Sequence, residues 1–312
     1  MRFNKLDLNL LVALNALLLD ASISRAAERL HMSQSAMSSA LGRLRDYFGD
    51  PLLVQVGRRM ELTPRAEVLR EAVRDVLVRV DSTIAAQPAF DPATSDREFR
   101  ILVSDYTLAT LAPHLLSLAH EHSKTLRFRF LPQVEHPQRM IERNEADMLV
   151  FPRVYCSEDH PIEPLWEEEF VCLVCSQSSH ARTALTVERF VTAGHVVMQP
   201  PNTELSFETW FLTRHDISRR VEVTTYSFAS VPALLVNTER VATVHKRLAQ
   251  IAQQSLALKI LPPPMAMPNM TQCIQWHKYR TQDPGLVWLR SVMHRAVERM
   301  DNALQDLKNG QT

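Results

Sequence analysis

Apolar residues recur at helical spacing near the start of the chain. Leu10, Leu14, Leu17 and Leu18 follow that spacing, which predicts a helix over residues 6–19 packed on a core. After a turn at residues 20–22, a second short helix is expected over residues 25–30, capped by Ser22 or Ser24. The small residues of this second helix allow a neighbouring helix to approach closely.

A third helix is expected from Ser33, a favourable N-cap, to about Phe48. Its apolar side chains fall at i, i+4, i+7 and i+11 and predict one buried stripe made of Met37, Leu41, Leu44 and Phe48. The opposite side carries Ser35, Ser39, Gly42 and Arg43, with Gln34 and Ser38 on its flanks. Two short helices joined by a tight turn are typical of a helix-turn-helix.

The outward side of the third helix is chemically suited to DNA. Small residues let a helix enter the major groove, where Gln can pair with adenine, Arg with guanine, and hydroxyl groups with bases or phosphates. The alternative is an ordinary solvated face, which would normally carry more Glu and Lys.

A hairpin with basic residues at its tip follows the third helix. Residues 52–56 and 60–62 read as strands around a turn at residues 57–59, and such a wing is placed to touch the DNA backbone or minor groove. Thr63 and Pro64 then start a further helix. The predicted DNA-contacting residues are Ser24, Ser33, Gln34, Ser35, Ala36, Ser38, Ser39, Arg43, Arg58, Arg59 and Arg65.

Residues 64–87 contain no internal Gly or Pro and predict one long helix. Its apolar residues follow a spacing close to that of a coiled-coil seam, and the predicted dimerisation residues are Leu69, Val73, Val76, Val80 and Ile84. A head of about sixty residues is too small to bury this helix, so pairing with a second copy is expected. Packing of the stripe on the chain's own body is the alternative.

Strand and helix patterns alternate after Phe90. Strands are expected over residues 99–104, 126–131, 147–151, 170–175, 195–199, 220–226, 241–245 and 272–277, and helices over residues 108–120 and 137–144. This alternation predicts an α/β body with parallel sheets. About 220 residues divide into two lobes, with a ligand-binding cleft between them.

The ends of these strands supply candidate residues for the cleft. The turn at residues 104–107 lies before a helix and offers backbone N–H groups to an anionic or phenolic oxygen. Each candidate could instead be a capped turn or a packed aromatic. The predicted effector-binding residues are Ser104, Asp105, Tyr106, Thr107, Phe151, Gln199, Asn202, Phe228, Ala229 and His245.

Length and charge add to this picture. A chain of 312 residues exceeds one usual core, so at least two domains are expected. The net charge is zero, yet residues 1–65 carry nine basic and six acidic groups, which suits phosphate binding. The longest apolar stretch, residues 8–19, is too short to cross a bilayer and lacks the flanks of a secretory signal, so we expect a cytoplasmic protein without a membrane partner.

Signatures of enzyme chemistry are missing from the sequence. Six glycines form no dinucleotide, phosphate-loop or nucleophile-elbow motif. Cys172 and Cys175 lie in an apolar strand pattern that points them to opposite faces, so two half-buried thiols are expected rather than a metal or redox pair. His120 and His122 do not share a helix face. We expect no enzyme activity, no cofactor and no metal.

The order and spacing of several segments resemble the amino-terminal domain of LysR-type transcriptional regulators. Ser35 is a departure, because many relatives have proline there, and it puts any particular base preference in doubt. The segments are Leu6-Asp7-Leu8-Asn9-Leu10-Leu11, Ala26-Ala27, Ser33-Gln34-Ser35-Ala36-Met37-Ser38, Leu41-Gly42-Arg43-Leu44-Arg45, Pro51-Leu52-Leu53-Val54 and Leu62-Thr63-Pro64-Arg65-Ala66.

The rest of the chain resembles the two-lobed effector-binding domain of that family, which has periplasmic-binding-protein architecture. The resemblance implies a winged helix-turn-helix domain at residues 1–63, a linker and dimerisation helix at 64–89, and an effector domain at 90–312. A transport binding protein would share the body but not the head.

Further segments are similar to the NodD branch, whose relatives include regulators of aromatic-compound degradation. These segments are Met1-Arg2-Phe3, Phe90-Asp91-Pro92, Phe99-Arg100-Ile101-Leu102-Val103-Ser104-Asp105, Trp210-Phe211-Leu212 and Asp283-Pro284-Gly285-Leu286-Val287-Trp288-Leu289-Arg290. The resemblance implies an activator of a catabolic or nodulation-like operon, controlled by a small aromatic, often phenolic, effector. Its partners would be double-stranded operator DNA, RNA polymerase and further copies of itself, as a dimer that pairs into a tetramer. A constitutive repressor without an effector is the alternative.

Overall fold

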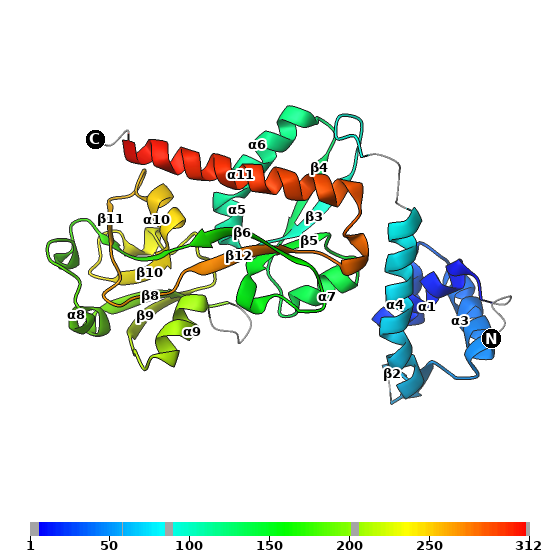
Figure 1. Cartoon of the computed structure of the whole chain (residues 1–312). Coiled ribbons are helices and arrows are strands. Elements are labelled where there is room, and N and C mark those ends of the chain that lie inside the picture. Colours follow the sequence, from blue (N-terminus) through cyan, green and yellow to red (C-terminus); the bar gives the residue numbers. More distant parts are fainter. Residues whose placement is uncertain (1–5, 58, 85–89, 201–205, 310–312) are drawn as a thin grey trace. The chain divides into compact units, whose positions relative to one another are not determined.

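The computed structural model describes residues 6–57, 59–84, 90–200 and 206–309. The chain forms two compact units, residues 1–87 and 88–312 (Figure 1). Expectations for Arg58, for residues 85–89 and for Asn202 lie outside the described residues.

The first unit is the winged helix-turn-helix that the sequence predicts. Asp7, Ser22 and Ser33 cap its first three helices, each side chain accepting a hydrogen bond from a backbone N–H group. Ser22 is therefore the cap of the second helix, and Ser24 lies inside that helix. The elements are α1 (Leu8–Asp20), α2 (Ile23–Arg29), α3 (Gln34–Phe48), β1 (Leu53–Val56), β2 (Arg59–Leu62) and α4 (Pro64–Ile84).

Side-chain hydrogen bonds fix the wing to the helices. The Arg45 guanidinium on α3 donates to the carbonyl oxygens of Pro51 at 2.8 Å and Leu53 at 3.0 Å. Asp50 accepts from the Leu52 N–H group and the Thr63 hydroxyl, both at 2.7 Å, and so closes the base of the hairpin. The wing is thus held in a fixed position beside α3.

The side chains of the predicted dimerisation seam on α4 differ in how far they are buried within the chain. Val73 is buried in the core of the first unit, and Leu69 packs against that core. Val76 is exposed and Val80 is half-buried, while the side chain of Ile84 lies outside the described residues. The apolar side chains of Leu69 and Val73 thus pack on the chain's own body, which is the alternative that the sequence left open.

Two five-stranded sheets form the second unit, one in each lobe (Figure 1). The first sheet has the order β4-β3-β5-β12-β6 and the second has the order β11-β7-β10-β8-β9. The strands are β3 (Glu98–Leu102), β4 (Arg127–Leu131), β5 (Met148–Pro152), β6 (Ile162–Glu168), β7 (Phe170–Cys175), β8 (Gly194–Met198), β9 (Arg220–Thr225), β10 (Val241–His245), β11 (Leu258–Leu261) and β12 (Met270–Gln275). The helices are α5 (Asp105–Thr110), α6 (Ala112–His122), α7 (Pro137–Glu142), α8 (Val187–Thr192), α9 (Phe207–Arg214), α10 (Lys246–Ala252) and α11 (Pro284–Asn309).

The sheets are mixed, so the prediction of parallel sheets holds for only part of each sheet. β3 pairs in parallel with β4 and β5, but β12 runs antiparallel to both β5 and β6. The reason is that the chain crosses between the lobes twice, at Glu168–Phe170 and again between β11 and β12, and the strands at these crossings run against their neighbours.

Two further expectations need correction. The single helix expected at residues 108–120 is two helices, α5 and α6, because Pro113 lies in the first turn of α6, where a helix starts readily. The strand β6 was missed because Pro161 and Pro164 interrupt its pattern. Proline is tolerated there because β6 is an edge strand, and its register with β12 shifts near Pro164.

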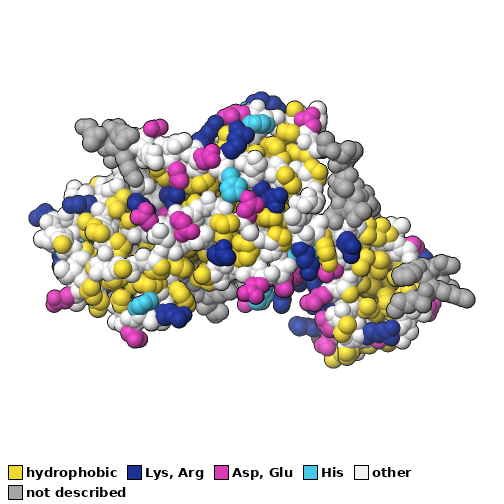
Figure 2. All heavy atoms as spheres, in the orientation of Figure 1, with side chains coloured by type: hydrophobic (Ala, Val, Ile, Leu, Met, Phe, Trp, Pro, Cys, Tyr) yellow, Lys and Arg dark blue, Asp and Glu magenta, His cyan; other side chains and the backbone are white. Residues whose placement is uncertain are grey.

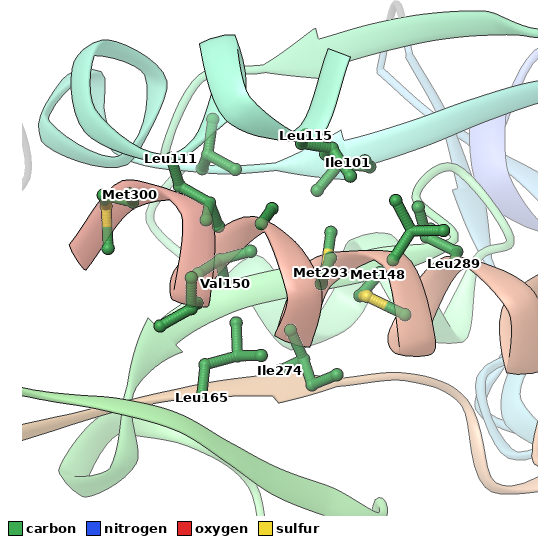
Figure 3. Close-up of a cluster of buried hydrophobic side chains, with 14 of the residues drawn as sticks. Ile101, Leu111, Leu115, Met148, Val150, Leu165, Ile274, Leu289, Met293 and Met300 are labelled. Atoms are coloured by element: carbon green, nitrogen blue, oxygen red, sulfur yellow. The ribbon is translucent and has the colours of Figure 1, made fainter. Parts of the chain in front are cut away.

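The C-terminal helix α11 anchors the core of the first lobe. Its apolar side chains, including Leu289, Met293 and Met300, pack between α6 and the sheet that contains Ile101 and Ile274 (Figure 3). Acidic and basic side chains are interspersed on the face of this unit that Figure 2 shows. In the described part of the chain, no helix is long and apolar enough to cross a membrane.

Candidate functional site

The third helix presents the polar face that the sequence predicts. Met37, Leu41 and Leu44 are buried, and Phe48 packs partly against the same core. The opposite side has open space: a Cβ atom added at Gly42 would meet no atom within 4 Å. The predicted contacts on this helix and its cap are all exposed, namely Ser33, Gln34, Ser35, Ala36, Ser38, Ser39 and Arg43.

The predicted DNA contacts outside this helix are exposed where the structure describes them. Ser24 on α2, Arg59 at the start of β2 and Arg65 in the first turn of α4 are exposed. The Arg43 guanidinium lies 3.3 Å from the carboxylate of Asp7, the N-cap of α1. Because this ion pair is exposed to solvent, it is weak and leaves Arg43 available to a stronger partner. The role of Asp7 was not predicted, although its place before an apolar helix is a cap signal.

A cavity lies between the two lobes of the second unit. The space open to the centres of water-sized molecules inside it is about 60 Å³. Its wall comprises Ser104, Tyr106, Gln133, Val134, Val150, Phe151, Pro152, Tyr155, Met198, Pro200, Ser206, Phe207, Glu208, Phe228, His245, Met270 and Gln272. Of the predicted effector residues, Ser104, Tyr106, Phe151, Phe228 and His245 line this cavity.

The other predicted effector residues have different places. The Thr107 hydroxyl is buried against that of Ser104, 3.1 Å away. Gln199 lies at the end of β8, where its N–H group donates to Thr225 and its side chain lines a separate cavity. Asp105 and Ala229 contact each other across the lobes, and neither lines the cavity between them. Thr107, Gln199, Asp105 and Ala229 therefore lie outside the wall of this cavity, and their role in effector binding stays a prediction.

Aromatic rings form much of the wall. Tyr106 stacks on His245 with ring centroids 4.0 Å apart, and Phe228 meets His245 edge-on at 4.8 Å. Phe170, which does not itself line the cavity, stacks on the lining residue Phe207 at 5.5 Å. Rings from both lobes therefore meet at one place, which suits a planar apolar ligand.

Hydrogen bonds join the lobes beside the cavity. The Asp105 carboxylate accepts from the Ser227 hydroxyl at 2.6 Å and from the Ala229 N–H group at 3.0 Å. The Tyr106 hydroxyl donates to the fully buried Glu168, which also accepts from Arg247 at 2.9 Å. Burial and the neighbouring carboxylate raise the pKa of Tyr106 well above its usual value, so it stays a neutral donor.

Two polar atoms in the wall lack a partner. Gln272 Oε1 and His245 Nδ1 are buried and make no hydrogen bond with any of the residues that the structure describes. Burial lowers the pKa of His245 to about 3, so its ring is neutral at pH 7. Unpaired buried polar groups are costly, and a bound molecule is one way of satisfying them.

Sequence reasoning missed Gln272 and Glu208 in the cavity wall. Gln272 lies in β12, which enters the first lobe by the second crossing, and Glu208 lies in the first turn of α9. A polar residue inside an apolar strand pattern was a usable signal for Gln272. Glu208 was missed because the candidate residues were taken from the ends of expected strands. Glu208 lies in α9, which only the fold brings to the cavity.

The cysteines and acidic groups form no metal site among the described residues. Cys172 and Cys175 lie in β7 as predicted, and both thiols are buried and free. Burial raises the pKa of the Cys172 thiol to about 12.

Comparison with known proteins agrees with this geometry. Residues 8–67 match the model of the bacterial regulatory helix-turn-helix protein, lysR family, and residues 93–298 match that of the LysR substrate binding domain. Nodulation protein D 1 of a Bradyrhizobium species is 38% identical over 308 residues, which cover 97% of each chain. Nodulation protein D 1 of Rhizobium meliloti is 37% identical over 302 residues, which cover 96% of this chain and 98% of the relative.

Solved structures show the same architecture. A probable transcriptional regulator from Pseudomonas aeruginosa has a TM-score of 0.64 at 25% identity, covering 93% of this chain and 97% of its own. A full-length OxyR from the same organism has a TM-score of 0.72 at 18% identity and covers 94% of each chain, which shows the fold alone. With both domains matched in order, the chain belongs to the LysR family of DNA-binding transcriptional regulators and is not an enzyme.

Proposed function

We propose that this LysR-type regulator controls transcription in response to a small aromatic effector bound in the cavity between its lobes. The cavity wall carries the proposal, because it combines aromatic rings with two unpartnered polar atoms. An aromatic ligand would stack on or against the ring cluster at Tyr106 and His245. A hydroxyl group on the ligand would satisfy Gln272 Oε1 or His245 Nδ1.

The operator is read by the outward face of α3. Gln34 and Arg43 are suited to base edges, and the exposed serines to bases or phosphates. Arg58 and Arg59 in the wing, with Arg65, would neutralise phosphates. This assignment is supported by the exposure of the described members and by the open space at Gly42.

Effector binding would change the arrangement of the lobes. An effector shifts the protein only if it binds one arrangement better than another. Asp105 contacts Ser227 and Ala229 and so joins the lobes beside the cavity. These contacts could form in one arrangement of the lobes and break in the other. The change would pass through α4 to the DNA-binding head and alter DNA bending or polymerase contact.

Such a regulator would act in the cytoplasm as an activator, in the manner that the resemblance to nodulation proteins suggests. Two heads are needed to read a two-fold operator, so we propose a dimer that pairs into a tetramer. Val76, Val80, Ile84 and the half-buried Leu69 remain predicted contacts on α4, whereas Val73 is buried in the chain's own core.

Footprinting upstream of the protein's own gene tests this function. The full chain is bound to that DNA with and without phenols, flavonoids, and chlorinated or nitrated aromatics, and thermal unfolding is followed with the same compounds. We expect one class to raise the unfolding temperature and to change the footprint. If no aromatic compound changes either measurement, the constitutive regulator replaces this proposal.

A further inference from the structure

The charge of the cavity wall restricts the ligand that can enter. Among the described lining residues none is Lys or Arg, and the one acidic residue is Glu208. Glu208 is only 3% exposed and lies in the first turn of α9, whose N-terminal residues line the cavity. A helix N-terminus would ordinarily favour an anionic ligand, but here the protein's own carboxyl already occupies the first turn.

The local contacts of Glu208 leave no cation for a ligand. Its Oε1 atom accepts from the Ser206 hydroxyl at 2.6 Å. The positive charge of Arg219 acts on Glu208. The Arg219 guanidinium donates to Thr209 Oγ1 at 2.5 Å, and Arg219 lines a different cavity together with Ile217 and Val221. Arg219 is thus not among the residues that line the cavity between the lobes.

Neither form of the Glu208 carboxyl can serve as a counter-ion for an acidic ligand. Burial raises the pKa of Glu208 even though Arg219 opposes this effect. Ionised Glu208 would repel an anion, and protonated Glu208 would offer a hydrogen bond but no positive charge. His245 is neutral at pH 7 and supplies no charge either. A carboxylate placed here would therefore be buried without a partner of opposite charge, which is strongly unfavourable.

The unpartnered acceptor favours a ligand that carries a hydrogen-bond donor. Gln272 Oε1 can only accept a hydrogen bond, so it requires an O–H or N–H group. A neutral phenol or aromatic alcohol offers that donor, whereas a carboxylate or phenolate oxygen does not.

We propose that Glu208 makes this cavity selective for an uncharged aromatic hydrogen-bond donor and against aromatic carboxylates. The proposal rests on the proposed function, because it assumes that an aromatic effector binds between the lobes. It names Glu208 as the residue that sets the charge preference and Gln272 as the acceptor of the ligand's donor group.

The test compares two compounds of nearly equal size, 2-hydroxybenzyl alcohol and salicylate. Binding of each to the full chain is measured by calorimetry at pH 7, for the wild type, Glu208→Gln and the control Glu188→Gln, an exposed residue of α8. We expect the wild type and the control to bind the alcohol at least about 100-fold more tightly than salicylate. Glu208→Gln should reduce that ratio at least about tenfold, by improving salicylate binding.

A wild type that binds salicylate as tightly as the alcohol would overturn the proposal and leave the aromatic-effector function standing. An unchanged ratio in a folded Glu208→Gln protein would remove Glu208 from its role. If the wild type binds neither compound and no other aromatic, both proposals fail. The wild-type ratio requires no variant, so it decides the charge preference even if Glu208→Gln unfolds.

The role of Gln272 is tested separately with Gln272→Leu. This variant removes the acceptor but adds no charge, so it should weaken binding of the alcohol about tenfold and leave binding of benzoate, which carries no O–H group at pH 7, nearly unchanged. Equal loss for both compounds would show that Gln272 supports the shape of the cavity rather than accepting the ligand's proton donor.

Discussion

Replacing Gly42 with leucine should make the head more stable and yet impair its reading of DNA. Gly42 lies in the middle of α3, and a Cβ atom added there meets no atom within 4 Å. Its φ angle is not in the left-handed region, so a side chain is compatible with the backbone. Glycine inside a helix is less stable than alanine by about 0.5–1 kcal/mol, and leucine is nearly as favourable as alanine.

The same side chain should obstruct the major groove. A helix with its side chains is about 10–12 Å across and the groove is about 12 Å wide, so the fit leaves little spare room. A leucine beside Ser35 and Ser39 would hold the helix away from the base edges. Losing one or two base contacts, each worth about 1–3 kcal/mol, reduces specific affinity at least about tenfold.

Calorimetry and fluorescence anisotropy measure the two effects on the full chain. The unfolding transition of the head should rise by about 2–8 °C. Binding to the footprinted operator should weaken while binding to competitor DNA changes little. Gly42→Ala is the matched control, because it gives a similar gain in stability with little bulk. Undiminished operator affinity in a stable Gly42→Leu protein would show that this face does not enter the groove.

Three further outcomes are expected. Although burial raises the pKa of Asp283, its bonds with Arg97 and Arg280 lower the pKa to about 2. Because this value is below the unfolded value near 3.8, the ion pairs stabilise the fold above pH 4 and cease to do so as the pH falls through about 2. In urea unfolding, Asp283→Asn should be about 2 kcal/mol less stable than the wild type at pH 7, with a difference that shrinks below pH 4; a constant difference would contradict the ionic origin. Arg59→Ala should weaken binding to all DNA sequences and reduce the salt slope by about 1, and a loss confined to the operator would instead indicate base reading. Asp105→Ala removes two contacts between the lobes, so it should lower the stability of the second unit by about 2 kcal/mol. The radius of gyration measured by X-ray scattering should increase. An unchanged radius would show that other contacts hold the lobes together.

The sequence alone determined the DNA-binding head. Its helices are specified by local signals, such as Ser33 at an N-cap and the apolar spacing from Met37 to Leu44, which act over a few residues. Because each signal lies within one element, it can be recognised without knowledge of the fold. The alternation of strands and helices likewise predicted an α/β body, and five of the expected cleft residues do line the cavity.

Tertiary structure decided how those elements combine. Whether Leu69 and Val73 face a second chain or the chain's own core depends on where α1 lies, which the spacing along α4 does not contain. The direction of β12 depends on the chain's return from the other lobe. Gln272 and Glu208 are 64 residues apart, and both line the same cavity only because the chain returns to the first lobe. The charge and the hydrogen-bonding groups of the cavity are therefore properties of the packed lobes, because they arise from side chains that local sequence patterns do not connect.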